Sequence, residues 1–126
     1  MVQTDVSQLS SECKEWLQIL RNYREELQTS KKSLQDSCRN TLSKDQLYEV
    51  EHFDNQFHIQ LINIHDLKHS IKTHDRKIEI ESSSGESIPD GTYTQHEELL
   101  DQFVSLESTL QELRSEFKNF ISASSC

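Results

Sequence analysis

Apolar residues recur along the first third of the chain at alternating spacings of three and four residues. This spacing places side chains on one face of an α-helix. The stripe consists of Val6, Leu9, Cys13, Trp16, Leu20, Tyr23, Leu27, Ser30 and Leu34, and it continues at Cys38 and Leu42. Because Asn40 is a helix stop signal, the pattern predicts a first helix over about residues 5–40.

A second helix is predicted over about residues 44–81. Ser43 followed by Gln46 forms a capping box, in which each side chain bonds the backbone N–H of the other residue. The main apolar stripe contains Val50, Phe53, Phe57, Ile64, Leu67, Ile71 and Ile78, and Leu47 and Leu61 widen it. So wide a face indicates contact with two other helices. The short connection from the first helix favours an antiparallel arrangement.

The stretch 82–93 has the composition of a linker, because it contains several serines, both glycines and the one proline. Thr94 with Glu97 is a second capping box, which predicts a third helix over about residues 95–121. Its stripe is Leu99, Phe103, Leu106, Leu110, Leu113, Phe117 and Phe120. We expect this helix to be the shortest, so that the tip formed by the other two, around Leu42 and Leu47, lacks a third cover.

These patterns predict an all-α fold, a single helical domain over residues 1–126. The expected architecture is an up-down-up antiparallel three-helix bundle with coiled-coil-like heptad packing. Hydrophobic residues make up 33% of the chain and charged residues 28%, which suits narrow apolar stripes and argues against a thick core.

The net charge and the first residues of the chain argue against several classes of partner and location. The formal net charge of −9 argues against nucleic acid or an anionic membrane surface, since both attract Lys and Arg. The first residues resemble no signal peptide and no apolar run is long enough to span a membrane, so we expect a cytoplasmic protein. The three cysteines show no CxxC spacing, and Cys13 lies on the apolar stripe, where a free cysteine is usually a small core residue.

No catalytic motif is present in the sequence. The chain has no phosphate-binding glycine loop, no dinucleotide-binding glycine pattern and no GxSxG nucleophile elbow. We therefore expect a protein that is not an enzyme and that has no catalytic residues and no cofactor.

Histidine has an uneven distribution along the chain, since five of the six lie within residues 51–75. Glu51, His58, His65 and His69 form a stripe at the edge of the apolar face of the second helix, and His65 and His69 have the i, i+4 spacing that can chelate a metal. A metal site would also need ligands from a facing helix. The first helix has no histidine and the third has only His96 at its start, so we expect no bound metal.

His74 falls at a core position of the second helix, as does Gln60. Polar residues at such positions more often set helix register or partner choice than carry out chemistry.

Ile59 and Ile62 lie outside the main stripe of the second helix, so the middle of this helix is apolar almost all the way round. Such a helix is usually buried on every side, which predicts a homodimer with both isoleucines in the interface. Leu100 and Val104 lie off the stripe of the third helix and are candidates for the same or a second contact. Another coiled-coil protein is the alternative partner.

Two functions remain open at this stage. The first is a structural or interaction module that self-associates. The second is a metal- or pH-responsive protein that uses His58, His65, His69 and Glu51, in which protonation of His58 and His65 below about pH 6 weakens association.

Three segments of the second helix, Glu51-His52-Phe53, Asn55-Gln56-Phe57 and Asp66-Leu67-Lys68-His69, resemble a signature of small uncharacterised helical proteins from Bacteroidetes-type bacteria. The likeness covers roughly residues 10–80 and implies a bacterial cytoplasmic helical protein. It implies no activity, cofactor or catalytic residue.

Overall fold

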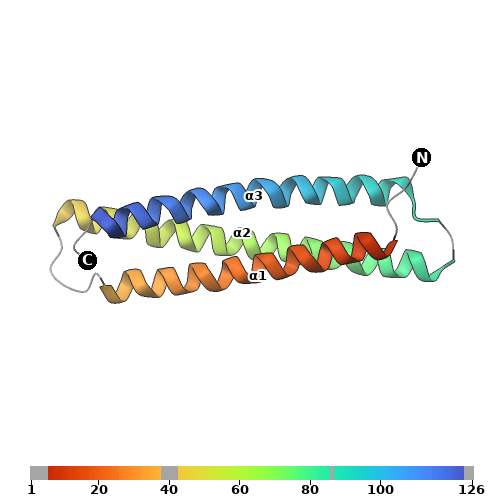
Figure 1. Ribbon diagram of the computed structural model, residues 1–126, viewed down its shortest axis with the longest axis horizontal. Helices are drawn as coiled ribbons and strands as arrows, with labels where there is room; N and C mark the ends of the chain where they lie inside the picture. The colour runs from red at the N-terminus through yellow and green to blue at the C-terminus, as the bar shows by residue number, and fades with distance from the viewer. Residues whose placement is uncertain (1–5, 38–42, 86, 124–126) are drawn as a thin grey trace.

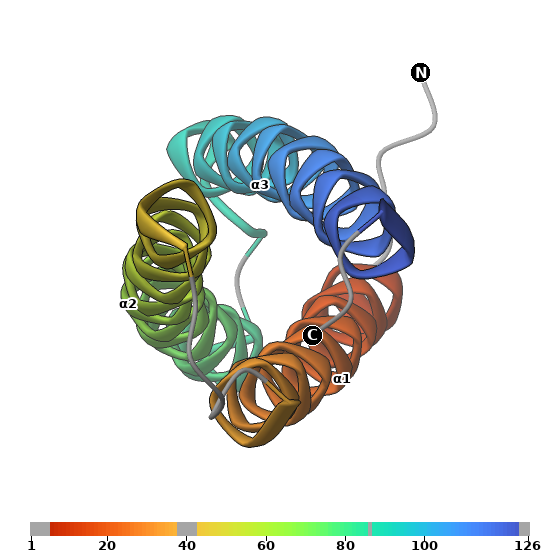
Figure 2. The same ribbon diagram turned by 90° about the vertical axis from the view of Figure 1, so that its left-hand side faces the viewer.

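The computed structural model describes residues 6–37, 43–85 and 87–123, and it consists of three long helices (Figure 1). These are α1 (Val6–Ser37), α2 (Lys44–Ser83) and α3 (Asp90–Ala123). Successive helices run in opposite directions along one axis, and the end-on view shows them around a common centre (Figure 2). The predicted all-α three-helix bundle is confirmed. None of the described helices is long and apolar enough to cross a membrane.

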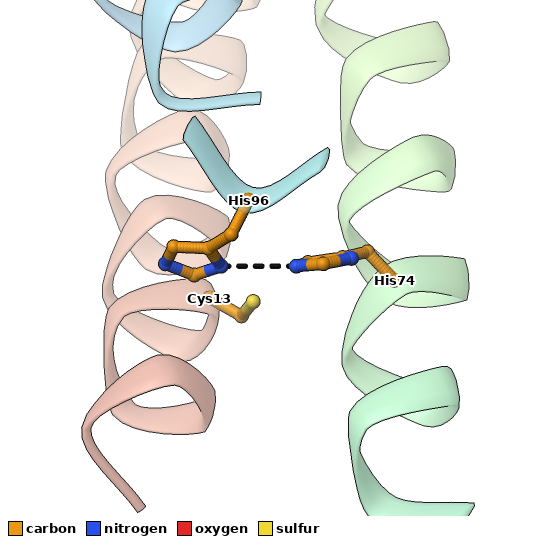
Figure 3. Close-up of side chains that lie close together, drawn as sticks. All are labelled: Cys13, His74 and His96. Atoms are coloured by element: carbon orange, nitrogen blue, oxygen red, sulfur yellow. Dashed lines mark hydrogen bonds between the residues drawn. The ribbon is translucent and has the colours of Figure 1, made fainter. Parts of the chain in front are cut away.

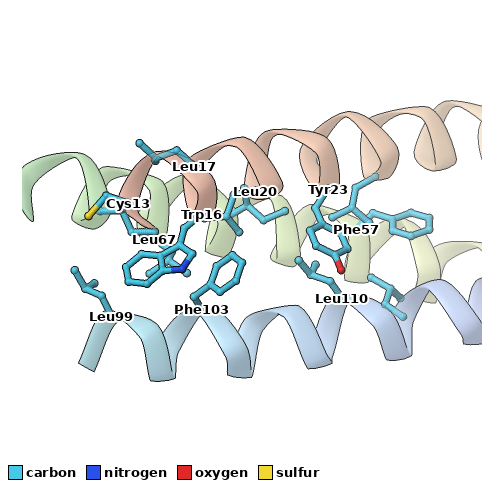
Figure 4. Close-up of a cluster of buried hydrophobic side chains, with 14 of the residues drawn as sticks. Cys13, Trp16, Leu17, Leu20, Tyr23, Phe57, Leu67, Leu99, Phe103 and Leu110 are labelled. Carbon is cyan, nitrogen blue, oxygen red and sulfur yellow. The ribbon is translucent and has the colours of Figure 1, made fainter. Parts of the chain in front are cut away.

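The buried core follows the predicted stripes. On α1 the buried residues include Leu9, Cys13, Trp16, Leu20, Tyr23, Leu27 and Leu34, with Leu17 beside them. They meet Phe53, Phe57, Ile64, Leu67, Ile71 and Ile78 of α2, and Leu99, Phe103, Leu110 and Leu113 of α3. Figure 4 shows side chains from all three helices meeting in one continuous layer. The burial of one stripe per helix is the main source of stability, because isolated helices are only marginally stable in water.

The start of α2 confirms the predicted capping box. The hydroxyl of Ser43 accepts a hydrogen bond from the backbone N–H of Gln46 at 3.2 Å, and the Gln46 side chain accepts one from the backbone N–H of Ser43 at 3.0 Å. The other end of α2 is followed by Gly85, whose φ of 79° is the left-handed conformation that commonly ends a helix.

The start of α3 corrects the predicted linker. We expected the helix to begin at the Thr94 capping box, but it begins at Asp90, directly after Pro89. Thr94 lies inside the helix, where its hydroxyl donates to the backbone carbonyl of Asp90 at 3.2 Å. The earlier start lets Thr92 and His96 pack into the bundle, and burial of this extra turn outweighs the local capping preference.

The predicted length of α3 is also wrong, whereas Leu47, at the tip that was predicted to lack a third cover, is exposed. α3 has 34 residues and α1 has 32, so α3 is not the shortest helix. Its last turns pack against the third turn of α2, where the ring of Phe120 lies 5.1 Å from that of Phe53. Leu47 does not widen the core stripe as expected, because it is exposed. Cys38, Asn40 and Leu42 lie outside the described residues.

An ion pair joins the middle of α1 to α3. The guanidinium of Arg114 donates two hydrogen bonds to the carboxylate of Glu26, at 2.5 and 2.6 Å, and lies 5.2 Å from the centre of the Tyr23 ring. The hydrogen bonds to Glu26 raise the pKa of Arg114. Because both partners are partly exposed, this pair fixes the orientation of the helices more than it adds to stability.

Replacement of a core leucine should measure the strength of this packing. Leu20 is fully buried, so Leu20→Ala should lower the free energy of unfolding by about 2 to 5 kcal/mol in urea titrations. Leu106→Ala should cost less, because Leu106 is only partly buried. The exposed Leu47, which is also a leucine, is the control, and Leu47→Ala should change stability by about 0.5 kcal/mol or less. Equal losses for the three variants would contradict this core.

Candidate functional site

The alternating helix directions bring the start of α1, the end of α2 and the start of α3 to the same end of the bundle (Figure 1). One polar residue from each helix meets there: Cys13, His74 and His96. Their ligand-capable atoms all lie within 4.8 Å of one another. The exposed fractions of the three residues are 0%, 1% and 5%, respectively. Figure 3 shows the sulfur close to the hydrogen bond that joins the two imidazole rings.

Hydrogen bonds determine the tautomers of this cysteine and histidine centre. Nε2 of His96 lies 2.9 Å from a carboxylate oxygen of Glu12 on α1, and a carboxylate can only accept, so Nε2 carries the proton. In the neutral His96 ring, Nδ1 is then an acceptor. Nε2 of His74 lies 2.9 Å from this Nδ1 and donates to it. The chain of bonds therefore runs from α2 through α3 to α1.

The remaining ring nitrogen of His74 has no hydrogen-bond partner. This atom, Nδ1, is buried, and an unpaired buried polar atom costs about 1 to 3 kcal/mol. Burial lowers the pKa of His74, and the positive charge that His96 would carry lowers it further, whereas the side-chain amide of Gln95 raises it. His74 is thus held as a neutral imidazole.

The thiol of Cys13 is held in its protonated form. Burial raises its pKa to about 12, and the carboxylates of Asp75 and Glu12 contribute to the rise, while Lys14 opposes it. Asp75 is fixed by the hydroxyl of Ser10, which donates to it at 2.8 Å and ties α1 to α2. A thiol in this environment is not an activated nucleophile, because the thiolate is the reactive form.

Aromatic and aliphatic side chains enclose the centre. The indole of Trp16 lies against His96, with ring centroids 4.7 Å apart, and Phe103 follows at 5.9 Å from Trp16. On the side nearest the α2–α3 connection, the hydroxyl of the buried Thr92 donates to Glu81 at 2.7 Å. The three polar side chains are therefore buried between aromatic rings and a few carboxylates, where electrostatic interactions are strong.

Only part of this centre was predicted correctly from the sequence. Cys13 and His74 were predicted at core positions, and both are buried. The sequence missed the role of His96, because it lay next to the predicted helix start. The signal that could have revealed the site is topological: in an up-down-up bundle, the start of the first helix, the end of the second and the start of the third meet.

The histidine stripe of α2 lies on the surface of the bundle. Glu51, His58, His65 and His69 are all exposed, and they do not belong to the metal-capable group found among the described residues. The four predicted interface residues are exposed as well, with exposed fractions of 39% for Ile59, 47% for Ile62, 41% for Leu100 and 55% for Val104. They are accessible to a partner, and the predicted dimer remains a prediction.

Comparison of the chain with family models, with curated proteins and with solved structures finds no match. The resemblance to helical proteins of Bacteroidetes-type bacteria and the cytoplasmic location therefore stay predictions.

The reactivity of Cys13 should report its burial. In a Cys38→Ser, Cys126→Ser background with a chelator present, alkylation of Cys13 near pH 8 should be at least about 100-fold slower in the folded protein than in urea, since both thiolate fraction and access are reduced. The rate is measured by mass spectrometry of quenched samples. Similar rates in the two states would show that Cys13 is not held in the core.

Proposed function

We propose that the protein is a non-enzymatic helical-bundle interaction protein that self-associates through the exposed face of α2. The observation that carries the proposal is a second stripe on this helix, opposite its core face. This outer stripe alternates spacings of four and three, and all of its members are exposed: Tyr48, His52, Asn55, Ile59, Ile62, Asp66, His69, Thr73, Arg76 and Ile80. Its exposed apolar members are Tyr48, Ile59, Ile62 and Ile80, and an apolar pair at the middle of a helix face is suited to packing against another helix.

A second copy of α2 in the antiparallel direction fits the outer stripe. With the two-fold axis between Ile59 and Ile62, Ile59 of one copy faces Ile62 of the second copy, and the reverse. These isoleucines form an apolar centre. The same register places Asn55 opposite Asp66, where an amide can donate to a carboxylate. The register is therefore self-complementary at its middle.

The residues that flank the stripe have complementary charges in this register. Glu51 faces Lys72 of the second copy, and Lys44 faces Glu79, and the symmetry makes each pair occur twice. A parallel pairing would instead place Asp66 opposite Asp66 and Arg76 opposite Arg76. Like charges at these positions are unfavourable, so the antiparallel dimer is the one that the sequence of α2 supports.

The pH-responsive alternative applies to the same face. His58 lies opposite His65 of the second copy, and the Glu51–Lys72 pairs flank them about two turns away. Within one chain, the nearest titratable residues of α2 are Asp54 for His58, and Asp66, Lys68 and His69 for His65. Since histidine titrates near neutral pH, acidification to about pH 5.5 would place two positive charges opposite each other and weaken the dimer.

The dimer can be tested by introducing charge at its centre. Ile59→Glu combined with Ile62→Glu should give a folded monomer, because four buried carboxylates would face one another without partners. Light scattering after size exclusion at tens of micromolar measures the mass, and circular dichroism confirms the helices. The matched control is Leu100→Glu with Val104→Glu on α3, which should leave the dimer intact. A monomeric wild-type protein, or a double variant that remains dimeric, would refute the interface.

A charge reversal tests the register. Glu51→Lys should raise the dissociation constant about 2- to 30-fold, because it places two lysine side chains opposite each other at both symmetric positions. Adding Lys72→Glu restores opposite charges and should recover the wild-type constant. Sedimentation equilibrium measures both values. If the second substitution weakens the dimer further, these residues do not face each other.

A further inference from the structure

We propose that Cys13, His74 and His96 bind a zinc-class divalent cation that fastens the three helices together at one end of the bundle. This inference goes beyond self-association, because the centre is buried inside one chain and the outer stripe of α2 lies on its surface.

The geometry of the centre is close to that of a metal site. Zinc binds nitrogen at about 2.0 to 2.1 Å and sulfur at about 2.3 Å, so tetrahedral ligand atoms lie about 3.3 to 3.6 Å apart. Here the sulfur and the two facing nitrogens all lie within 4.8 Å of one another, and the nitrogens are 2.9 Å apart. Opening the His74–His96 hydrogen bond by about 0.4 Å, with a small movement of Cys13, would reach metal-ligand geometry.

Glu12 prepares His96 for this role. Metal-binding histidines commonly donate their second N–H to a carboxylate, which fixes the tautomer and orients the ring. The 2.9 Å bond from Nε2 of His96 to Glu12 does this, and it leaves the lone pair of Nδ1 directed at His74 and Cys13. A carboxylate on one side of a ring and two potential ligands on the other is the arrangement expected for a bound cation.

His74 supplies independent evidence from its unpaired nitrogen. Without a cation, the proton of this ring lies on Nε2 and leaves the buried Nδ1 without a partner. When a cation binds Nε2, the proton moves to Nδ1. The side-chain amide of Gln95 favours a proton on this ring. Cation binding would thereby turn the unpaired acceptor Nδ1 into a donor whose proton Gln95 favours.

The charges of the centre balance for a divalent cation. Binding releases one proton, from the Cys13 thiol, and both imidazoles remain neutral, so the bound group carries one net positive charge. Glu12 and Asp75, which raise the pKa of the thiol, place negative charge beside it. Their field favours a cation at the position where it disfavours a bare thiolate.

The ligand types select the class of metal. One thiolate and two imidazoles suit zinc and related borderline ions, whereas calcium and magnesium require oxygen ligands. No fourth Cys, His, Asp or Glu joins the group within the described ranges, so the fourth position is left for water or a small anion. Because the ligands come from three helices, the cation acts as a cross-link within the bundle.

Cobalt is the spectroscopic probe for this site. We use the full chain with Cys38→Ser and Cys126→Ser, so that Cys13 is the only thiol, after removal of metals with a chelator. Titration with cobalt should saturate at one ion per chain, with a thiolate-to-cobalt charge-transfer band and strong visible bands of a tetrahedral ion. Zinc should then abolish the bands and raise the melting temperature. A folded protein that shows neither cobalt bands nor a zinc-dependent rise in melting temperature overturns the proposal.

Variants locate the cation. Cys13→Ser should remove the charge-transfer band, and His74→Gln or His96→Gln should weaken cobalt binding at least about 100-fold. Glu12→Gln, which keeps the helix and removes the orienting carboxylate, should weaken binding about 10- to 100-fold. His65→Gln with His69→Gln, on the exposed stripe, is the matched control and should bind normally. Charge transfer that persists in folded Cys13→Ser, or is lost in the control, overturns the assignment.

The Ile59→Glu, Ile62→Glu variant separates the two proposals. It should bind cobalt with the affinity of the parent protein, because Ile59 and Ile62 are exposed and lie about 18 Å or more along α2 from the buried His74. Loss of binding in this variant, with the helices intact, would show that the cation depends on the dimer and would overturn a site contained within one chain.

Discussion

The structure depends on a single constraint: each helix has one apolar stripe that only the other two helices can cover. No pair of helices suffices, since the one buried cluster contains residues of all three helices. The short connections force neighbouring helices to run in opposite directions. This arrangement decides which residues share an end of the bundle, and so it brings a residue near the start of α1 beside residues near the end of α2 and the start of α3.

The periodicity of the sequence was sufficient to predict the helices and most of the core. The stripe of α1 is buried at seven of its nine predicted positions, and only Val6 and Ser30 are partly exposed. The capping box of α2 formed as expected, because Ser43 and Gln46 need only each other. The capping box of Thr94 did not form. There, local chemistry competed with burial of the preceding turn around Thr92, which depends on the other helices and cannot be read from a short segment.

The buried centre was harder to predict for a related reason. Periodicity gives the direction in which a side chain leaves its own helix, but it does not give the axial offset between helices. Cys13 and His74 could be assigned to the core, yet their meeting with His96 depends on where α3 begins. The histidines of residues 52–69 were the metal candidates predicted from the sequence, because they are close together along the chain. Side chains along an exposed helix face point into solvent. They can hold a metal only where a second helix supplies facing ligands.

The position of Trp16 has a practical consequence. It is the one tryptophan of the chain, and its ring lies against His96 in the cysteine and histidine centre. Its fluorescence therefore originates beside the cysteine and histidine centre. Protonated or metal-bound imidazoles alter the emission of an adjacent indole. The bundle thus contains an intrinsic optical probe of its own interior, which can be read in dilute solution without any label.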